Sequence, residues 1–399
     1  MGFNMKQVEF FFDVVCPYAY IASQQIEAIA QRANAQIHWI PVLLGGIYKS
    51  LNSAQYPSSN WNASKQRQGL KDLLHEAQRK NISLNYPKSH PQKTVNAMRL
   101  LCACPSEKIA NLAHRLYEAY WVKSLELNDE LLNKIALEFN LSVDVFSQED
   151  SKQKLFRNTE KAVKNGVFGV PSMLVDGELW WGQDRLHFVE QALGKKPIIE
   201  PLPQKNTAKK LLFFHDFASP FSYLASTQIE RLAQKYGADV EFKPILLGGL
   251  FRKLGTPMVP IFVMSPSKQK YFLKDAKDWA KWWNVPFEMP QCFPVNTIKA
   301  LRLSLVYPQL IEKLYHALWA QGLDISKENV LSDILKDSNI NPQEAFTTIQ
   351  TPQVKQELFD NQDLALSKGV FGVPSMLVKD NLWWGQDRLF AVAQALTSP

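Results

Sequence analysis

The sequence predicts an α/β protein built from two tandem copies of one domain, each carrying a helical insertion. First, a chain of 399 residues is too long for one ordinary core and fits two domains. Second, the stretches 166–186 and 369–389 differ at only three positions. Third, each half runs through a β-rich segment, a helix, a second β-rich segment, a helical section, and then a strand pair with a closing helix.

A constant offset of 203 residues relates the two halves over most of their length. It aligns Cys16 with Ser219, and each of the two is followed by a proline. We therefore expect domains at 1–194 and 210–399. The proline-rich segment 195–209 is expected to be an extended, fairly stiff linker.

Each half begins with an apolar β-rich run that leads into the Cys-Pro or Ser-Pro step. Proline is favourable in the first turn of a helix, so a helix is expected to follow directly. Within the first helical section, Leu70, Leu73, Leu74 and Ala77 are expected on one face. The expected elements of the two halves are strands at 8–14 and 211–217, helices at 18–32 and 221–236, strands at 36–42 and 239–246, and helical sections at roughly 65–165 and 268–368.

Each repeated stretch contains a Val-Pro step before Ser-Met-Leu-Val. A proline costs least at the first position of a strand, so Pro171 and Pro374 are expected there, with a cis or trans peptide bond left open. A strand pair follows, and the closing helix is expected to begin at Asp184 or Asp387. The order strand–helix–strand, helical insertion, strand–strand–helix is that of a thioredoxin-type core.

The composition is that of a soluble globular protein, with 46% apolar and 21% charged residues. Apolar runs long enough to cross a membrane are absent from the sequence, and its start lacks the pattern of a signal peptide. Four cysteines do not make a disulfide framework, so we expect a cytosolic protein. The net charge of +7 comes from scattered lysines, which gives nucleic-acid binding no support.

Four segments of the second half carry a family resemblance that extends over nearly all of both halves: 216–225, 246–249, 293–297, and 369–374 together with 384–388. The chain resembles two fused copies of the kappa-class glutathione transferase and 2-hydroxychromene-2-carboxylate isomerase family, a branch of the DsbA-like thioredoxin fold. The resemblance implies two tandem DsbA-like domains, glutathione as cofactor, a small-molecule substrate, and halves that pack as an intramolecular pseudo-dimer.

Ser219 and Cys16 stand where a strand passes into a helix. Backbone N–H groups and the positive end of a helix favour an anion there, including a thiolate. The resemblance implies that Ser219 activates the glutathione thiol, although a simple helix-capping serine remains an alternative. Cys16 lies in Cys-Pro-Tyr-Ala and has no resolving partner in that motif, so it is either a single reactive thiol or a buried inert cysteine.

Further glutathione contacts follow from the resemblance. The backbone of Val373 or Val170, before the proline, would pair with the cysteinyl part. The pairs Gln386-Asp387 and Gln183-Asp184 would receive the γ-glutamyl end, while the aspartates could instead cap the closing helices.

Three other positions could contact ligands. Lys49 and Arg252 could hold a carboxylate, with solvated loop cations as the alternative. Asn296 resembles the family's substrate-side asparagine, and the first half has Lys93 there. This difference, together with cysteine for serine, suggests that the two sites no longer do the same job.

Three functions are compatible with these residues. The leading one is a glutathione-dependent isomerase or transferase, in which a Ser219-stabilised thiolate adds reversibly to an unsaturated carbonyl. The alternatives are DsbA-like or glutaredoxin-like thiol–disulfide exchange through Cys16, and a non-catalytic binding module. Cys102 and Cys104 lack further clustered ligands, so we expect helix packing there and no metal site.

Overall fold

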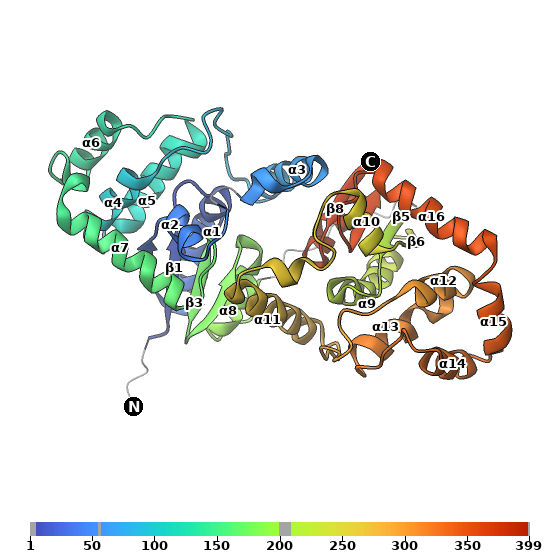
Figure 1. The fold of residues 1–399 in the computed structure, drawn as a ribbon. Helices are drawn as coiled ribbons and strands as arrows, with labels where there is room; N and C mark the ends of the chain where they lie inside the picture. The colour runs from blue at the N-terminus through green and yellow to red at the C-terminus, as the bar shows by residue number, and fades with distance from the viewer. Residues whose placement is uncertain (1–4, 55–56, 199–208, 398–399) are drawn as a thin grey trace. The chain divides into compact units, whose positions relative to one another are not determined.

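The computed structural model describes residues 5–54, 57–198 and 209–397, and most of the expected linker 195–209 lies outside them. The chain divides into two compact units (Figure 1). The first unit comprises Met1–Asn60, Leu70–Ile199 and Ser265–Tyr271, and the second comprises Trp61–Gly69, Glu200–Met264 and Phe272–Pro399. Each unit therefore includes a short segment from the other half of the sequence. Across the described ranges, none of the helices has the length and apolar character needed to span a bilayer.

Each unit contains one four-stranded sheet in which the first two strands are parallel and the remaining pairs are antiparallel. The strand orders are β2-β1-β3-β4 and β6-β5-β7-β8. This arrangement confirms the predicted α/β class with two tandem thioredoxin-type domains. The strands are β1 (Gln7–Phe12), β2 (Gln36–Pro41), β3 (Ser172–Val175), β4 (Glu178–Trp181), β5 (Lys210–His215), β6 (Asp239–Pro244), β7 (Ser375–Val378) and β8 (Asn381–Trp384).

The first strand of each unit along the chain, β1 or β5, leads into the long helix α1 (Pro17–Ala33) or α9 (Pro220–Lys235). Proline occupies the first turn of both helices, as predicted, because its missing N–H would be unpaired there in any residue. The strands end at Phe12 and His215, two residues earlier than predicted, since the chain turns at once toward the helix: the Cys16 N–H donates to Asp13 O at 3.0 Å.

The insertions are helical in both halves, as predicted. In α3 (Ala63–Arg79), Leu73 and Ala77 are buried, but Leu70 and Leu74 are each 44% exposed. The predicted buried face is therefore correct for Leu73 and Ala77 and wrong for the other two residues. The other helices of the two insertions are α4 (Val95–Ala103), α5 (Ile109–Tyr117), α6 (Asp129–Glu138), α7 (Glu149–Lys164), α11 (Pro266–Trp283), α12 (Ile298–Val306), α13 (Ile311–Trp319), α14 (Glu328–Lys336), α15 (Pro342–Thr348) and α16 (Pro352–Ser367).

The closing helices do not begin at Asp184 and Asp387, and that prediction is wrong. A 3₁₀ turn, Gln183–Arg185 or Gln386–Arg388, comes first, and the helices are α8 (Leu186–Ala192) and α17 (Leu389–Thr397). Gly182 and Gly385 occupy the N-cap positions of the 3₁₀ turns, and Oδ1 of each aspartate pairs with the arginine that follows it.

One of the buried positions that differ between the two cores carries a titratable side chain. The first sheet stacks Phe10 and Phe12 with a centroid distance of 5.6 Å, whereas His215 takes the place of Phe12 in the second. Its Nδ1 lies 2.9 Å from the Tyr315 hydroxyl, and burial lowers the pKa of His215 to about 3. His215 is therefore neutral in the folded protein.

This difference predicts an acid-labile second unit. The folded pKa of His215 lies below the unfolded value of about 6.5, so unfolding takes up a proton and stability falls as pH drops below about 6.5. At pH 5 the loss attributable to His215 should be about 2 kcal/mol. We expect His215→Phe to remove that part of the pH dependence, measured as urea-unfolding free energies at pH 7.5 and pH 5.

The matched control is Phe12→His, which should add a similar acid sensitivity to the first unit. A pH dependence of stability that is unchanged by His215→Phe would contradict the assignment of this acid sensitivity to His215.

Candidate active site

Ser219 lies at the N-cap of α9, facing the Val373–Pro374 peptide bond, which is cis. Its Oγ accepts a hydrogen bond from Ser222 N at 3.1 Å and donates one to Val373 O at 3.3 Å. The side chain is buried. The structure thus brings together the strand-to-helix corner and the prolyl bond, although 154 residues separate Ser219 from Val373.

Cys16 takes the corresponding place in the first unit. Its Sγ donates to Val170 O at 3.1 Å, next to the cis Val170–Pro171 bond. Burial raises the pKa of the thiol to about 12, and the backbone N–H groups of Ala19 and Tyr18 only partly oppose that rise. Cys16 is therefore a protonated hydrogen-bond donor at neutral pH, as Ser219 is.

A buried aspartate lies beneath each corner, and sequence reasoning missed both. The Asp216 carboxylate accepts from Ala218 N at 3.0 Å, from Leu247 N at 2.8 Å and from Thr297 Oγ1 at 2.7 Å. These donors belong to the corner itself, to the start of α10 (Leu247–Lys253) and to the residue before α12. Burial raises the pKa of Asp216, and the three hydrogen bonds oppose that rise.

Asp13 repeats this arrangement in the first unit. Its carboxylate accepts from Val15 N at 3.1 Å, Leu44 N at 2.9 Å and Thr94 Oγ1 at 2.8 Å, which ties the corner to α2 (Leu44–Ser50) and α4. The recurrence of Asp-x-x-Cys and Asp-x-x-Ser at the same offset was the sequence signal that could have identified both residues.

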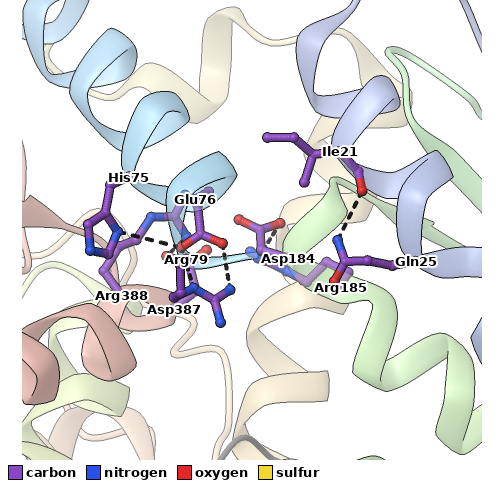
Figure 2. A network of polar contacts seen from close by, with 9 residues as sticks. All are labelled: Ile21, Gln25, His75, Glu76, Arg79, Asp184, Arg185, Asp387 and Arg388. Atoms are coloured by element: carbon purple, nitrogen blue, oxygen red, sulfur yellow. Dashed lines mark hydrogen bonds and ion pairs between the residues drawn. The ribbon is translucent and has the colours of Figure 1, made fainter. Parts of the chain in front are cut away.

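The expected γ-glutamyl contacts lie in the 3₁₀ turns. Asp387 Oδ1 is 3.1 Å from Arg388 Nη1, and Asp184 Oδ1 is 2.9 Å from Arg185 Nη1; Figure 2 draws both pairs. Gly385 precedes this turn with φ +108°, and a Cβ there would lie 2.6 Å from Asp387 Oδ1. Glycine is needed at this position for both its backbone angle and its lack of a side chain. Gln386 and Gln183 are buried beside their aspartates.

With this geometry in place, the chain can be compared with known proteins. A family model described as DSBA-like thioredoxin domain matches it twice, at residues 7–194 and 210–397. The chain belongs to this family. It is a tandem fusion of two DsbA-like domains, and its relatives include a 2-hydroxychromene-2-carboxylate isomerase and glutathione transferases of the kappa class.

Individual relatives match about half of this chain and nearly all of their own length. The 2-hydroxychromene-2-carboxylate isomerase of Sphingobium xenophagum is 29% identical over 191 residues, covering 45% of this chain and 94% of that protein. Glutathione S-transferase kappa 2 of Caenorhabditis elegans is 28% identical over 218 residues, covering 50% and 95%. A solved structure of 2-hydroxychromene-2-carboxylate isomerase aligns with a TM-score of 0.43 and 24% identity, covering 47% and 94%.

The remaining expected ligand contacts of this DsbA-like tandem protein are less enclosed. Lys49, at the end of α2, and Arg252, at the end of α10, are exposed. Asn296 is exposed as well, and its Oδ1 accepts from Ile298 N at 3.1 Å, which leaves the amide nitrogen for a ligand. Two cavities of the first unit, about 730 and 460 Å³, are lined by residues other than Cys16.

The structure also adds a cation that was not predicted. In the second unit, Lys65 Nζ lies 5.4 Å from the Trp384 ring centroid, and Gln68 Nε2 donates to Leu382 O at 2.7 Å. Trp384 packs so closely on Gly372 that a Cβ there would lie 2.7 Å from its Nε1. Lys65 therefore places a positive charge near the ring of Trp384, which packs against Gly372, the residue before Val373.

Lys268 has the equivalent position in the first unit, 5.4 Å from the Trp181 ring, and burial lowers its pKa. The two lysines obey the 203-residue offset, but each belongs to the sequence half opposite its tryptophan. All four cysteines are free, and Cys102 and Cys104 are buried at the end of α4.

The buried carboxylate beneath the corner predicts a large stability effect. Asp216→Ala would leave three donors without an acceptor, two of them backbone N–H groups, so the unfolding free energy of the second unit should fall by about 3 kcal/mol or more. Urea denaturation measures this. Asp239→Ala removes an exposed aspartate of the same unit and should change stability by less than about 0.5 kcal/mol. Equal effects of the two substitutions would refute the role of Asp216.

The raised pKa of Cys16 predicts slow alkylation. Iodoacetamide at pH 7.5 should leave Cys16 unmodified in the native protein and modify it after urea unfolding, because only the thiolate reacts. Peptide mass mapping over time measures this, with Cys292, which is partly exposed, as the internal reference. Modification of native Cys16 faster than of Cys292 would show a reactive thiolate.

Proposed function

We propose that this DsbA-like tandem protein is a glutathione-dependent isomerase or transferase whose main site lies in the second unit. The observation that supports this most directly is the Ser219 hydroxyl, held at the start of α9 and facing the Val373–Pro374 bond. The relatives named as an isomerase and as glutathione transferases agree with it. A small-molecule substrate and a cytosolic location belong to the same proposal, and so does pseudo-dimer packing of the two halves.

Ser219 would stabilise the glutathione thiolate by redirecting its hydrogen bond. Its oxygen is anchored by Ser222 N–H, whereas its own donor bond to Val373 O is long at 3.3 Å and easily exchanged for a sulfur acceptor. The N-terminus of α9 adds a partial positive charge at the same place. Val373, Gln386, Asp387 and Arg252 would hold the rest of the tripeptide.

The reaction needs no oxidant or reductant. The thiolate forms a carbon–sulfur bond with an unsaturated carbonyl compound, and the double-bond electrons move to the carbonyl oxygen. Rotation about the new single bond, followed by expulsion of the thiolate, gives cis–trans isomerisation. Protonation of the carbon instead leaves glutathione attached, which is transfer.

Thiol–disulfide exchange through Cys16 is less well supported. Burial raises the pKa of Cys16 to about 12, which opposes formation of the attacking thiolate. The Cys-Pro-Tyr-Ala motif also lacks the second cysteine that a dithiol oxidant needs.

The test is Ser219→Ala in the full chain. Loss of one preorganised donor should lower kcat/KM with glutathione and an unsaturated ketone about 100-fold. Cys16→Ser keeps a hydroxyl donor in the first unit and should leave most of this activity. Full activity in Ser219→Ala with loss in Cys16→Ser would move the reaction to Cys16 and contradict the proposal. Absence of glutathione binding to the wild-type protein by calorimetry would leave only a binding module.

A further inference from the structure

A chain of buried polar groups lies beneath the Ser219 corner. His215 and Tyr315 are 0% and 1% exposed. His215 Nδ1 lies 2.9 Å from the Tyr315 hydroxyl, and that hydroxyl donates to Asp216 O at 3.4 Å. The backbone N–H of Ser219 donates to the same carbonyl oxygen at 3.1 Å. The chain of hydrogen bonds therefore ends on the atom that closes the turn before Ser219.

The protons along this chain point toward that turn. His215 Nε2 has no hydrogen-bond partner among the described residues. A proton on Nε2 would be a buried donor without an acceptor, and it would turn the Tyr315 proton toward His215 and away from Asp216. The favoured tautomer therefore has His215 Nδ1–H donating to Tyr315, whose O–H donates to Asp216 O. Hydrogen bonds in series polarise one another, and here each positive end faces the turn.

Packing holds the Tyr315 ring against the helix that carries Ser219. Tyr315 belongs to α13, and its ring centroid lies 4.6 Å from that of Phe217 and 5.9 Å from that of Tyr223. Tyr223 belongs to the first turn of α9, where its N–H donates to Ser219 O at 3.1 Å. The position of the Tyr315 hydroxyl is thereby tied to the start of α9.

The first unit lacks this chain. Phe12 takes the place of His215, and Tyr117 corresponds to Tyr315 through an offset of 198 residues, which also aligns Trp121 with Trp319. The Tyr117 ring lies 6.2 Å from the Phe12 ring, and its buried hydroxyl has no hydrogen-bond partner in the part of the chain that the structure describes. The Cys16 N–H nevertheless donates to Asp13 O at 3.0 Å. The turn itself therefore forms without the chain.

The chain also lowers the stability of the second unit in acid. Burial lowers the pKa of His215 to about 3, so the folded protein excludes a proton that the unfolded chain binds. Phe12 shows that phenylalanine packs at this place of the repeated sheet. A buried polar residue that destabilises one copy of a repeated domain, directly beneath the proposed site of that copy, points to a role at the site.

We propose that Tyr315 and His215 are positioning residues for the thiolate at Ser219. They act through the turn 216–219: the chain fixes the Asp216 carbonyl group that receives the Ser219 N–H, and its dipoles place their positive ends toward the turn. This inference rests on the proposed function and deepens it, because it assigns the stronger thiolate stabilisation to the second unit. The first unit, with Phe12 and the unpaired Tyr117 hydroxyl, lacks this contribution.

Removing the Tyr315 hydroxyl tests the proposal in the full-length Cys16→Ala protein. Tyr315→Phe should raise the pKa of the bound glutathione thiol by about 0.5 unit and lower kcat about threefold, with KM little changed. Ultraviolet titration reads the pKa, and turnover of an unsaturated ketone with glutathione gives kcat and KM. A merely structural role of Tyr315 would lower the unfolding temperature and leave the pKa of the bound thiol where it was.

Three further variants serve as controls. Tyr117→Phe removes the unpaired hydroxyl of the first unit and should leave the pKa of the bound thiol unchanged. His215→Phe should reproduce the effect of Tyr315→Phe, whereas His215→Asn, which keeps a side-chain N–H near the Nδ1 position, should retain most of the parental pKa. If Tyr315→Phe does not fold, His215→Phe still decides the question, because phenylalanine fills the same position in the first unit.

The outcomes separate this inference from the proposed function. If the parent protein lowers the pKa of bound glutathione and neither Tyr315→Phe nor His215→Phe changes it, the chain has no positioning role while the proposed function stands. Equal shifts in Tyr315→Phe and Tyr117→Phe would also contradict the inference. If glutathione does not bind the parent protein, the proposed function fails and this inference fails with it.

Discussion

The architecture of both units depends on a buried carboxylate that ties three distant segments together. Asp216 accepts hydrogen bonds from the corner after β5, from the start of α10 and from Thr297 before α12, and Asp13 makes the same three bonds in the first unit. Each bond gives a partner to a buried or partly buried donor, and such a donor is costly to leave unpaired. The carboxylate thereby fixes where the N-terminus of α9, and with it Ser219, points relative to Val373.

The repeat has preserved this framework while the residues at the two corners differ. Asp13 and Asp216 make equivalent bonds, and the prolyl bonds at Pro171 and Pro374 face the two corners alike. Cysteine replaces serine at one corner, and Lys93 stands in the first half where Asn296 stands in the second. In a fused repeat, residues around one corner can change without destabilising the other unit, because each unit has its own core and its own buried aspartate.

A feature could be predicted from the sequence when the residues that cause it are neighbours along the chain. The helix start after Cys16 or Ser219 depends on a proline one residue away, and the order of elements along each half follows from the repeated pattern. The role of Asp216 was not predicted, because two of its three hydrogen-bond donors lie 31 and 81 residues away from it along the chain. The predicted start of the closing helix was wrong because a 3₁₀ turn, Gln386–Arg388, precedes the helix, which spacing alone does not reveal. Lys65 was missed since it belongs to the half of the sequence opposite Trp384.

The central claim is that the corner around Ser219 keeps a small thiol ionised. Ultraviolet titration of glutathione bound to the Cys16→Ala variant, followed near 240 nm, measures the pKa of that thiol at the second site. The account predicts a value at least one unit below that of free glutathione, and a return toward the free value when Ser219→Ala is added. A bound thiol that titrates like free glutathione in both proteins would contradict it.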